Sequence, residues 1–210
     1  MGTVYSVDDG SINFRPAADD RTATIGDIVV QNTAPFESTQ PARFTVSIDR
    51  NRTILNAGIL KLEALQTGGN SNAQIVITAP NASTFLGSSS GLYVSGISGV
   101  DQYTTLRKWG NGTLYVDGDN TPWNGTVSID QGALQVLSQN ALGGSSSTIK
   151  VMKNGVLEIG VAGYTRDWSI SYADGSAERW AVDNARIGTG THERARSRQG
   201  DVANRRGSNQ

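Results

Sequence analysis

A short pattern, Gly-x-Leu-x-(Leu/Val/Ile), recurs along the chain and constrains its fold more than any other feature. The pattern occurs at residues 58–62, 112–116, 132–136 and 155–159. Looser alternating runs lie at residues 28–30, 44–48, 75–77 and 92–94. The central leucines Leu114, Leu134 and Leu157 follow one another at nearly even spacing. Leu60, Ile77 and Val94 continue the series upstream at equal, slightly shorter intervals.

Each of these runs is short, alternates apolar with polar residues and is bounded by Gly, Asn, Asp or Ser, which is typical of β-strands. A unit of this size cannot bury its own apolar side chains, so successive units must stack. Stacking would superimpose Leu114, Leu134 and Leu157 in one interior. We therefore predict an all-β parallel β-helix, a solenoid of roughly 20-residue turns about 4.8 Å apart, with glycines at its corners.

The alternative is an antiparallel β-sandwich, which also has regularly spaced short strands with turn signals between them. A sandwich gives no reason for one local sequence to recur about every 20 residues. The recurrence therefore favours the solenoid.

Composition removes several classes of function. Lys and Arg total 18 against 19 Asp and Glu, so the basic excess of a nucleic-acid binder is missing. The chain has no Cys and one His, His192, which excludes thiolate chemistry and clustered Cys or His metal sites. We expect no catalytic, cofactor-binding or metal-binding residues, no cofactor and no nucleic-acid partner. No apolar run reaches the ~20 residues of a transmembrane helix.

The chain divides near residue 189. Residues 1–188 hold the repeats and form the predicted solenoid domain, with the strongest repeat at 106–143. Residues 189–210 carry five Arg against Glu193 and Asp201 and have almost no apolar side chains. Such a segment cannot bury enough surface to become ordered, so we predict a basic, disordered tail.

The segment 106–143 carries the most specific signal in the chain. The positions that carry it are Leu106, Lys108, Gly110, Gly112, Thr113, Leu114, Val116, Gly118, Asn120, Thr121, Gly125, Thr126, Ile129, Gly132, Leu134, Val136, Ala141, Leu142 and Gly143. This gapless pattern resembles the autotransporter-associated β-strand repeat of bacterial surface proteins, and a weaker likeness extends over roughly residues 28–160. Pro122 and Trp123 depart from it, since the family usually has Tyr and a small residue there.

The resemblance implies a right-handed parallel β-helix that serves as a structural or presentation segment of a surface-displayed or secreted passenger, without catalysis. It implies a cell-surface or extracellular location. Its partners would be host or matrix glycans and proteins, or other segments of a larger passenger, and adhesion is the expected use. The first residues lack a signal-peptide pattern, and no membrane barrel pattern follows residue 160. We therefore expect a fragment, a truncated copy or a partner without its own export parts.

Two groups of aromatic residues are candidates for roles beyond the core. Trp109, Tyr115 and Trp123 are candidate surface contacts, because outward aromatic side chains form stacking platforms for sugars or proteins; packing is the equal alternative. The second group is expected to cap the open end of the coil. It comprises Tyr164, Trp168, Tyr172 and Trp180.

A carbohydrate-processing β-helix enzyme, resembling a polysaccharide lyase or hydrolase, is the alternative function. Its candidate carboxylates are Asp101, Asp117, Asp119 and Asp130, which would have to face one another. Arg107 and Lys108 could stabilise a developing negative charge. Residues 117–120 also suggest a calcium loop, but they lack the spacing of known calcium motifs. Solvated corners explain these residues equally well.

Overall fold

The computed structural model describes residues 1–80, 90–99 and 104–161, together with the backbone of three short strands at 168–172, 177–180 and 186–188. The fifteen strands of these residues belong to a single sheet, and no helix occurs among them. The strands are β1 (Val4–Val7), β2 (Asp9–Phe14), β3 (Thr22–Thr24), β4 (Ile28–Asn32), β5 (Ala42–Ile48), β6 (Ile54–Ala64), β7 (Ala73–Thr78), β8 (Gly91–Gly99), β9 (Thr105–Trp109), β10 (Thr113–Val116), β11 (Thr126–Val136), β12 (Thr148–Ile159), β13 (Trp168–Tyr172), β14 (Ala177–Trp180) and β15 (Arg186–Gly188).

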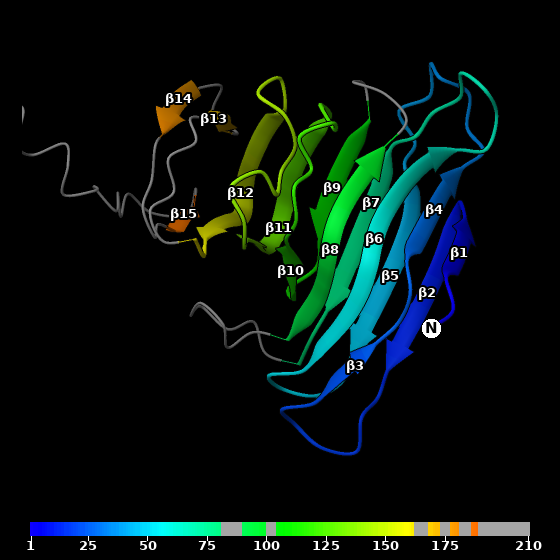
Figure 1. Ribbon diagram of the computed structural model, residues 1–210, viewed down its shortest axis with the longest axis vertical. Helices are drawn as coiled ribbons and strands as arrows, with labels where there is room; N and C mark the ends of the chain where they lie inside the picture. The colour runs from blue at the N-terminus through cyan, green and yellow to red at the C-terminus, as the bar shows by residue number, and fades with distance from the viewer. Residues whose placement is uncertain (81–89, 100–103, 162–167, 173–176, 181–185, 189–210) are drawn as a thin grey trace, which may run out of the picture.

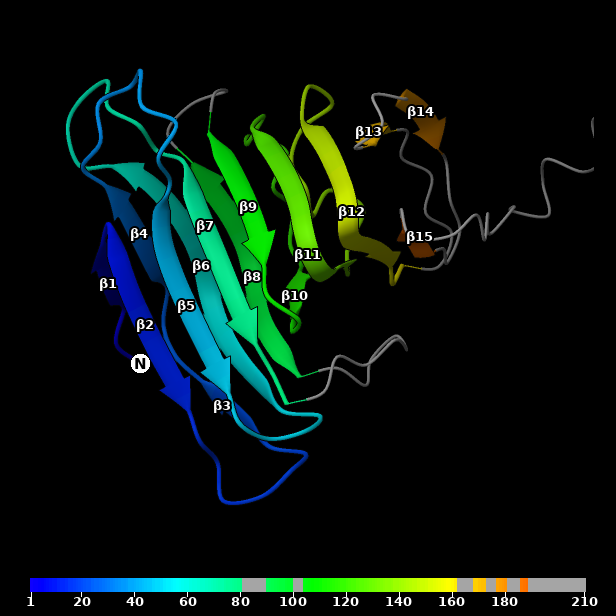
Figure 2. The same cartoon turned by 180° about the vertical axis from the view of Figure 1, so that it is seen from behind.

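The strands pair in parallel, as a coiling chain requires. Every pairing among β1 to β13 is parallel. Antiparallel pairing in the described part occurs between β12 and β15 and between β13 and β14. The antiparallel sandwich is therefore excluded, and the prediction of an all-β solenoid of parallel strands is confirmed. Figures 1 and 2 show the strands as successive layers from the N-terminal end to β12.

The strands lie on three faces of the coil. The long strands β6, β8, β11 and β12 each bend in the middle, so that their two halves lie on different faces. Face A contains β1, β4 and the second halves of β6 and β8. Face B contains β2, β5, β7, β9, the first halves of β11 and β12, and β13. Face C contains β3, the first halves of β6 and β8, β10, and the second halves of β11 and β12. Figure 2 looks onto face B.

A column of leucines runs through the interior of face C. Leu114 pairs with Leu134, and Leu134 pairs with Leu157, so the predicted superposition of these three residues is confirmed. Leu55 and Leu92 extend the same column toward the N-terminus. All five are buried, because the alternation of the strands points every second side chain inward.

The predicted length of a winding, about 20 residues, holds only in the C-terminal half. There Leu92, Leu114, Leu134 and Leu157 pair in succession, each with the next. In the N-terminal half the windings are longer, since Leu55 pairs with Leu92 and Ile28 pairs with Leu60. The extra residues lie between the strands, and each strand still pairs with the equivalent strand of the next winding.

The predicted upstream series through Leu60, Ile77 and Val94 is wrong. Leu60 pairs with Ile97 on face A, Ile77 pairs with Val46 on face B, and Val94 pairs with Val116 on face C. The three residues lie on different faces of the coil. The equal interval between them is therefore the distance along the chain from one face to the next, and it is not the length of a winding.

One buried side chain, that of Asn120, ties three windings together at a corner. Its amide nitrogen donates to the carbonyl oxygens of Asp117 at 3.0 Å and Ala141 at 2.7 Å. Its amide oxygen accepts from the backbone N–H of Ile97 at 2.9 Å. Because the side chain is buried, water could not take over its hydrogen bonds if the side chain were removed.

We expect Asn120→Ala to lower the free energy of unfolding by about 2 kcal/mol, because buried groups of three windings lose their partner. Urea unfolding followed by circular dichroism measures the change. The exposed Asn154 provides the control, and Asn154→Ala should change stability by less than about 0.5 kcal/mol. Equal effects of the two substitutions would contradict the bridging role of Asn120.

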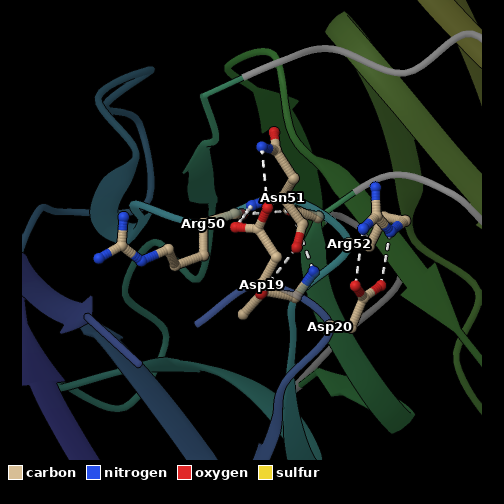
Figure 3. Close-up of polar contacts among 7 residues, drawn as sticks. Asp19, Asp20, Arg50, Asn51 and Arg52 are labelled. Atoms are coloured by element: carbon tan, nitrogen blue, oxygen red, sulfur yellow. Dashed lines mark hydrogen bonds and ion pairs between the residues drawn. The ribbon is translucent and has the colours of Figure 1, made fainter. Parts of the chain in front are cut away.

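Corners in the N-terminal half use exposed charged pairs instead (Figure 3). Arg52 binds the Asp20 carboxylate with two N–O distances of 2.5 and 2.6 Å. Asp20 and Arg52 occupy equivalent corner positions of two windings, because each precedes the paired residues Thr22 and Ile54 by two. Both adopt positive φ angles, 57° and 48°. Beside them, Asp19 accepts from the backbone N–H of Asn51 at 3.0 Å. The hydrogen bond from Arg52 lowers the pKa of Asp20.

The C-terminal end of the described part changes strand direction. β13 continues face B in parallel, whereas β14 and β15 run antiparallel to β13 and β12. Their backbone places Trp168 opposite Trp180. The proposed cap also included Tyr164, which lies outside the described residues, as does the predicted tail at 189–210. The capping role of the second aromatic group stays a prediction.

Candidate functional site

The outer surface of face B carries two parallel rows of side chains that suit recognition. Arg43, Gln74 and Arg107 are paired in succession and form the first row. Thr45, Val76 and Trp109 are paired in the same way and form the second. Between the two rows, Phe44, Ile75 and Lys108 point inward and are buried. Both rows therefore lie on the outer side of a sheet whose other side is packed.

A hollow of about 580 Å³ lies over these rows and is open to solvent. We call it the Trp109 hollow. Its lining residues are Arg43, Gln74, Val76, Thr78, Trp109, Gly110, Asn111 and Gln131. The lining combines one aromatic ring, one small apolar side chain and several hydrogen-bonding groups, so it is more polar than the lining of most small-molecule pockets.

The indole ring of Trp109 is held in place by Asp130. The indole N–H donates to Oδ2 of Asp130 at 2.5 Å. The same carboxylate accepts from Nε of Arg107 at 2.8 Å, and Ser128 donates to its other oxygen at 2.5 Å. The Asp130 side chain is only 6% exposed, so the ring is anchored at its edge while 38% of Trp109 remains exposed.

The charge of the hollow is positive. Arg43 is exposed, and none of the ion pairs found in the described part of the chain involves it. The nearby negative charge on Asp130 is matched by Arg107, whose Nη2 atom lies 2.6 Å from the carboxylate. The lining itself contains no carboxylate among the described residues. Asp9 is the register partner of Arg43 on the side away from Gln74 and does not line the hollow. An anion entering the hollow from the Trp109 side would therefore meet Arg43 before it met this carboxylate.

Of the three aromatic residues predicted as surface contacts, only Trp109 is exposed. Tyr115 is 7% exposed and Trp123 is 3% exposed, so the prediction that these two form a contact surface is wrong. The ring of Trp123 packs at a corner against Gly99 and Gly125, where an added Cβ atom would overlap it. The absence of side chains at these glycines makes the space that buries the ring.

Lys108 points into the core rather than toward a substrate. It occupies an interior row between Ile75 and Ile129 and is fully buried. Its ammonium group donates to the carbonyl oxygens of Trp109, Gly110 and Gln131 at 2.8–3.0 Å. The alternation of the strand contains the signal for this, since Lys108 follows the inward Leu106 by two positions. A role for Lys108 in stabilising charge on a bound polysaccharide is therefore wrong.

The environment of Lys108 changes its ionisation. Burial lowers the pKa of Lys108 from 10.5 to about 7. A charged ammonium group can donate to all three carbonyls, whereas a neutral amine can donate to two. The carbonyl bonds therefore oppose the effect of burial, and the group can change its charge within the physiological pH range.

The carboxylates proposed for an enzyme are not gathered in one place. Asp130 is bound to Arg107 and Trp109 on the outside of face B. Asp117 follows β10 and accepts from the Tyr93 hydroxyl at 2.9 Å, and burial raises the pKa of Tyr93. Asp119 accepts from its neighbour Thr121.

Asp101 lies outside the described residues. Within the described part, no group of three or more metal-ligating side chains could hold an ion. The 117–120 loop that suggested calcium is instead organised by Asn120, which turns inward to bridge the windings.

The structure contains no helix in its described ranges with the length and apolar character needed to cross a bilayer. Comparisons with known proteins identify no relative: no family model, no curated protein and no solved structure matches the chain.

Proposed function

We propose that the chain is a structural and presentation segment of a bacterial autotransporter-like surface or secreted passenger, with a right-handed winding and no catalytic role. Its function would be to hold an adhesive surface away from the cell on a stiff rod. The observation that carries the proposal is the in-register leucine column of face C. Repeated windings with one continuous interior are what the repeat at 106–143 needs in order to build such a rod.

The distribution of side chains supports presentation over catalysis. Ionisable residues of the repeat are engaged in structural contacts: Lys108 with three carbonyls, and Arg107 and Asp130 with each other. On face B, Arg43 and Trp109 remain exposed on a backbone that is paired on both sides. A sheet of this kind keeps its exposed groups at fixed spacing, which favours repeated or extended ligands.

The location is tested with antibodies raised against the purified full chain and applied to cells of the source bacterium. We expect labelling of intact cells, or recovery of the chain from the medium, because a passenger is exported. A cytoplasmic marker should be labelled only after permeabilisation. If the chain behaves like that marker, the passenger proposal fails.

The absence of catalysis is tested by incubating the full chain with acidic and neutral polysaccharides. We expect no increase in reducing ends and no unsaturated uronate products over the background without protein. Catalytic turnover that is lost in the Asp119→Ala variant would contradict this expectation and favour the carbohydrate-processing enzyme.

A further inference from the structure

We propose that the Trp109 hollow binds an oligosaccharide that carries carboxylate groups, with a sugar ring on Trp109 and a carboxylate at Arg43. The proposal gives the adhesive part of the proposed function a ligand class and rests on it. It combines two observations that are independent of each other, the anchored exposed indole and the unmatched charge of the lining.

The indole supplies a prepared surface for a pyranose ring. Its N–H is bonded to Asp130 at 2.5 Å, so the ring loses little conformational freedom when a ligand binds. Val76 lies next to it in the same row and lines the hollow, although only 8% of it is exposed, so the indole supplies most of the apolar floor. The apolar C–H face of a sugar ring fits such a floor, while its hydroxyl groups point outward.

The charge of the hollow selects among sugars. Arg43 lies two strands from Trp109 and one row away, which places their Cα atoms about 12 Å apart at the usual spacings of a sheet. An arginine side chain spans part of this distance and presents a planar set of donors that matches a carboxylate. Because Arg107 already matches Asp130, no acidic group of the described lining repels the ligand.

The remaining lining suits a chain of sugars rather than a small compact molecule. Gln74, Thr78 and Gln131 line the hollow and provide side-chain donors and acceptors for hydroxyl groups. The hollow is open to solvent, so a polymer can enter and leave without a free end. A volume of about 580 Å³ is within the range of about 300–1,000 Å³ for ligand sites.

The test uses calorimetric titration of the full chain with a galacturonic acid hexamer and with its methyl ester. The two ligands share their rings and hydroxyl groups and differ in charge. We expect the acid to bind and the ester to bind at least about tenfold more weakly, and we expect added salt to weaken only the acid.

Variants separate the two parts of the hollow. Trp109→Ala should weaken the acid and the ester by about tenfold or more, and Trp109→Phe should restore part of the loss. Arg43→Gln should weaken the acid by about tenfold and leave the ester unchanged. Tyr5→Ala and Arg21→Gln, which remove an exposed aromatic ring on face A and an exposed cation beside β3 of face C, should bind like the unchanged chain.

No binding of the acid overturns the proposal, as does equal binding of acid and ester or unchanged binding by Trp109→Ala. Thermal unfolding of each variant shows that it is folded, and Trp109→Phe provides the test if Trp109→Ala is not. The antibody experiment on intact cells is independent of this titration. A displayed chain without acid binding would leave the passenger proposal standing and remove only the ligand.

Discussion

Replacing Gly132 with alanine should lower the free energy of unfolding by more than about 4 kcal/mol. Two physical effects act at this corner of β11. Gly132 has a φ angle of +71°, which costs an L-residue about 1–2 kcal/mol. An added Cβ atom would also overlap the carbonyl oxygen of Gly110 and lie 3.1 Å from Nζ of Lys108, so the backbone of the adjacent winding would have to move.

Gly68 provides a matched control for the Gly132 substitution. Its φ angle is +73°, and nothing lies within 4 Å of an added Cβ atom. Gly68→Ala should therefore cost only the backbone part, about 1–2 kcal/mol. Urea unfolding of both variants measures the difference. If Gly132→Ala is no more destabilising than Gly68→Ala, the close stacking of the windings at this corner is incorrect.

The second large effect is a dependence of stability on pH that arises from Lys108. The pKa of Lys108 is lowered from 10.5 to about 7 in the fold. Between these values the unfolded chain holds a proton that the native chain has lost, so unfolding takes up a proton. The free energy of unfolding should therefore rise with pH in this window, by about 2–3 kcal/mol between pH 7.5 and 9.5.

Lys108→Met separates this contribution from the other titrating groups, because methionine is similar in length and carries no charge. The carboxylates whose pKa values are lowered by their partners, such as Asp20 and Asp27, titrate in acid and do not contribute above pH 7. Urea unfolding at several pH values should show a rising stability in the unchanged chain and a flat profile in Lys108→Met. A rising profile of the same slope in both would assign the effect to another group.

The repeat could be read from sequence where the windings are short and uniform. Leu114, Leu134 and Leu157 are equivalent because the windings between them are nearly equal in length. The pattern beginning at Gly58 led to a wrong assignment of Leu60 to the leucine series. Leu60 has the same local neighbours as Leu114 but lies on face A. Local sequence specifies a strand and its inward residues, while the face depends on the length of the preceding corner.

The candidate site was only partly predictable for a related reason. Trp109 could be identified as an aromatic residue of the repeat, but its anchoring by Asp130 depends on the register between β9 and β11. Arg43 is distant from Trp109 in the sequence and enters the site only because β5, β7 and β9 pair in succession. Tyr115 shows the opposite case, an aromatic residue at repeat spacing that is buried.

Consecutive windings superimpose in parallel and in register, and the fold and the proposed rod both depend on this arrangement. Methyl-labelled leucines measured by nuclear Overhauser spectroscopy test it most directly, because the structure pairs Leu92 with Leu114, Leu114 with Leu134, and Leu134 with Leu157. We expect cross-peaks between each of these pairs. Missing cross-peaks between Leu134 and Leu157, together with the close Hα–Hα contacts of antiparallel strands between β10 and β11, would contradict it.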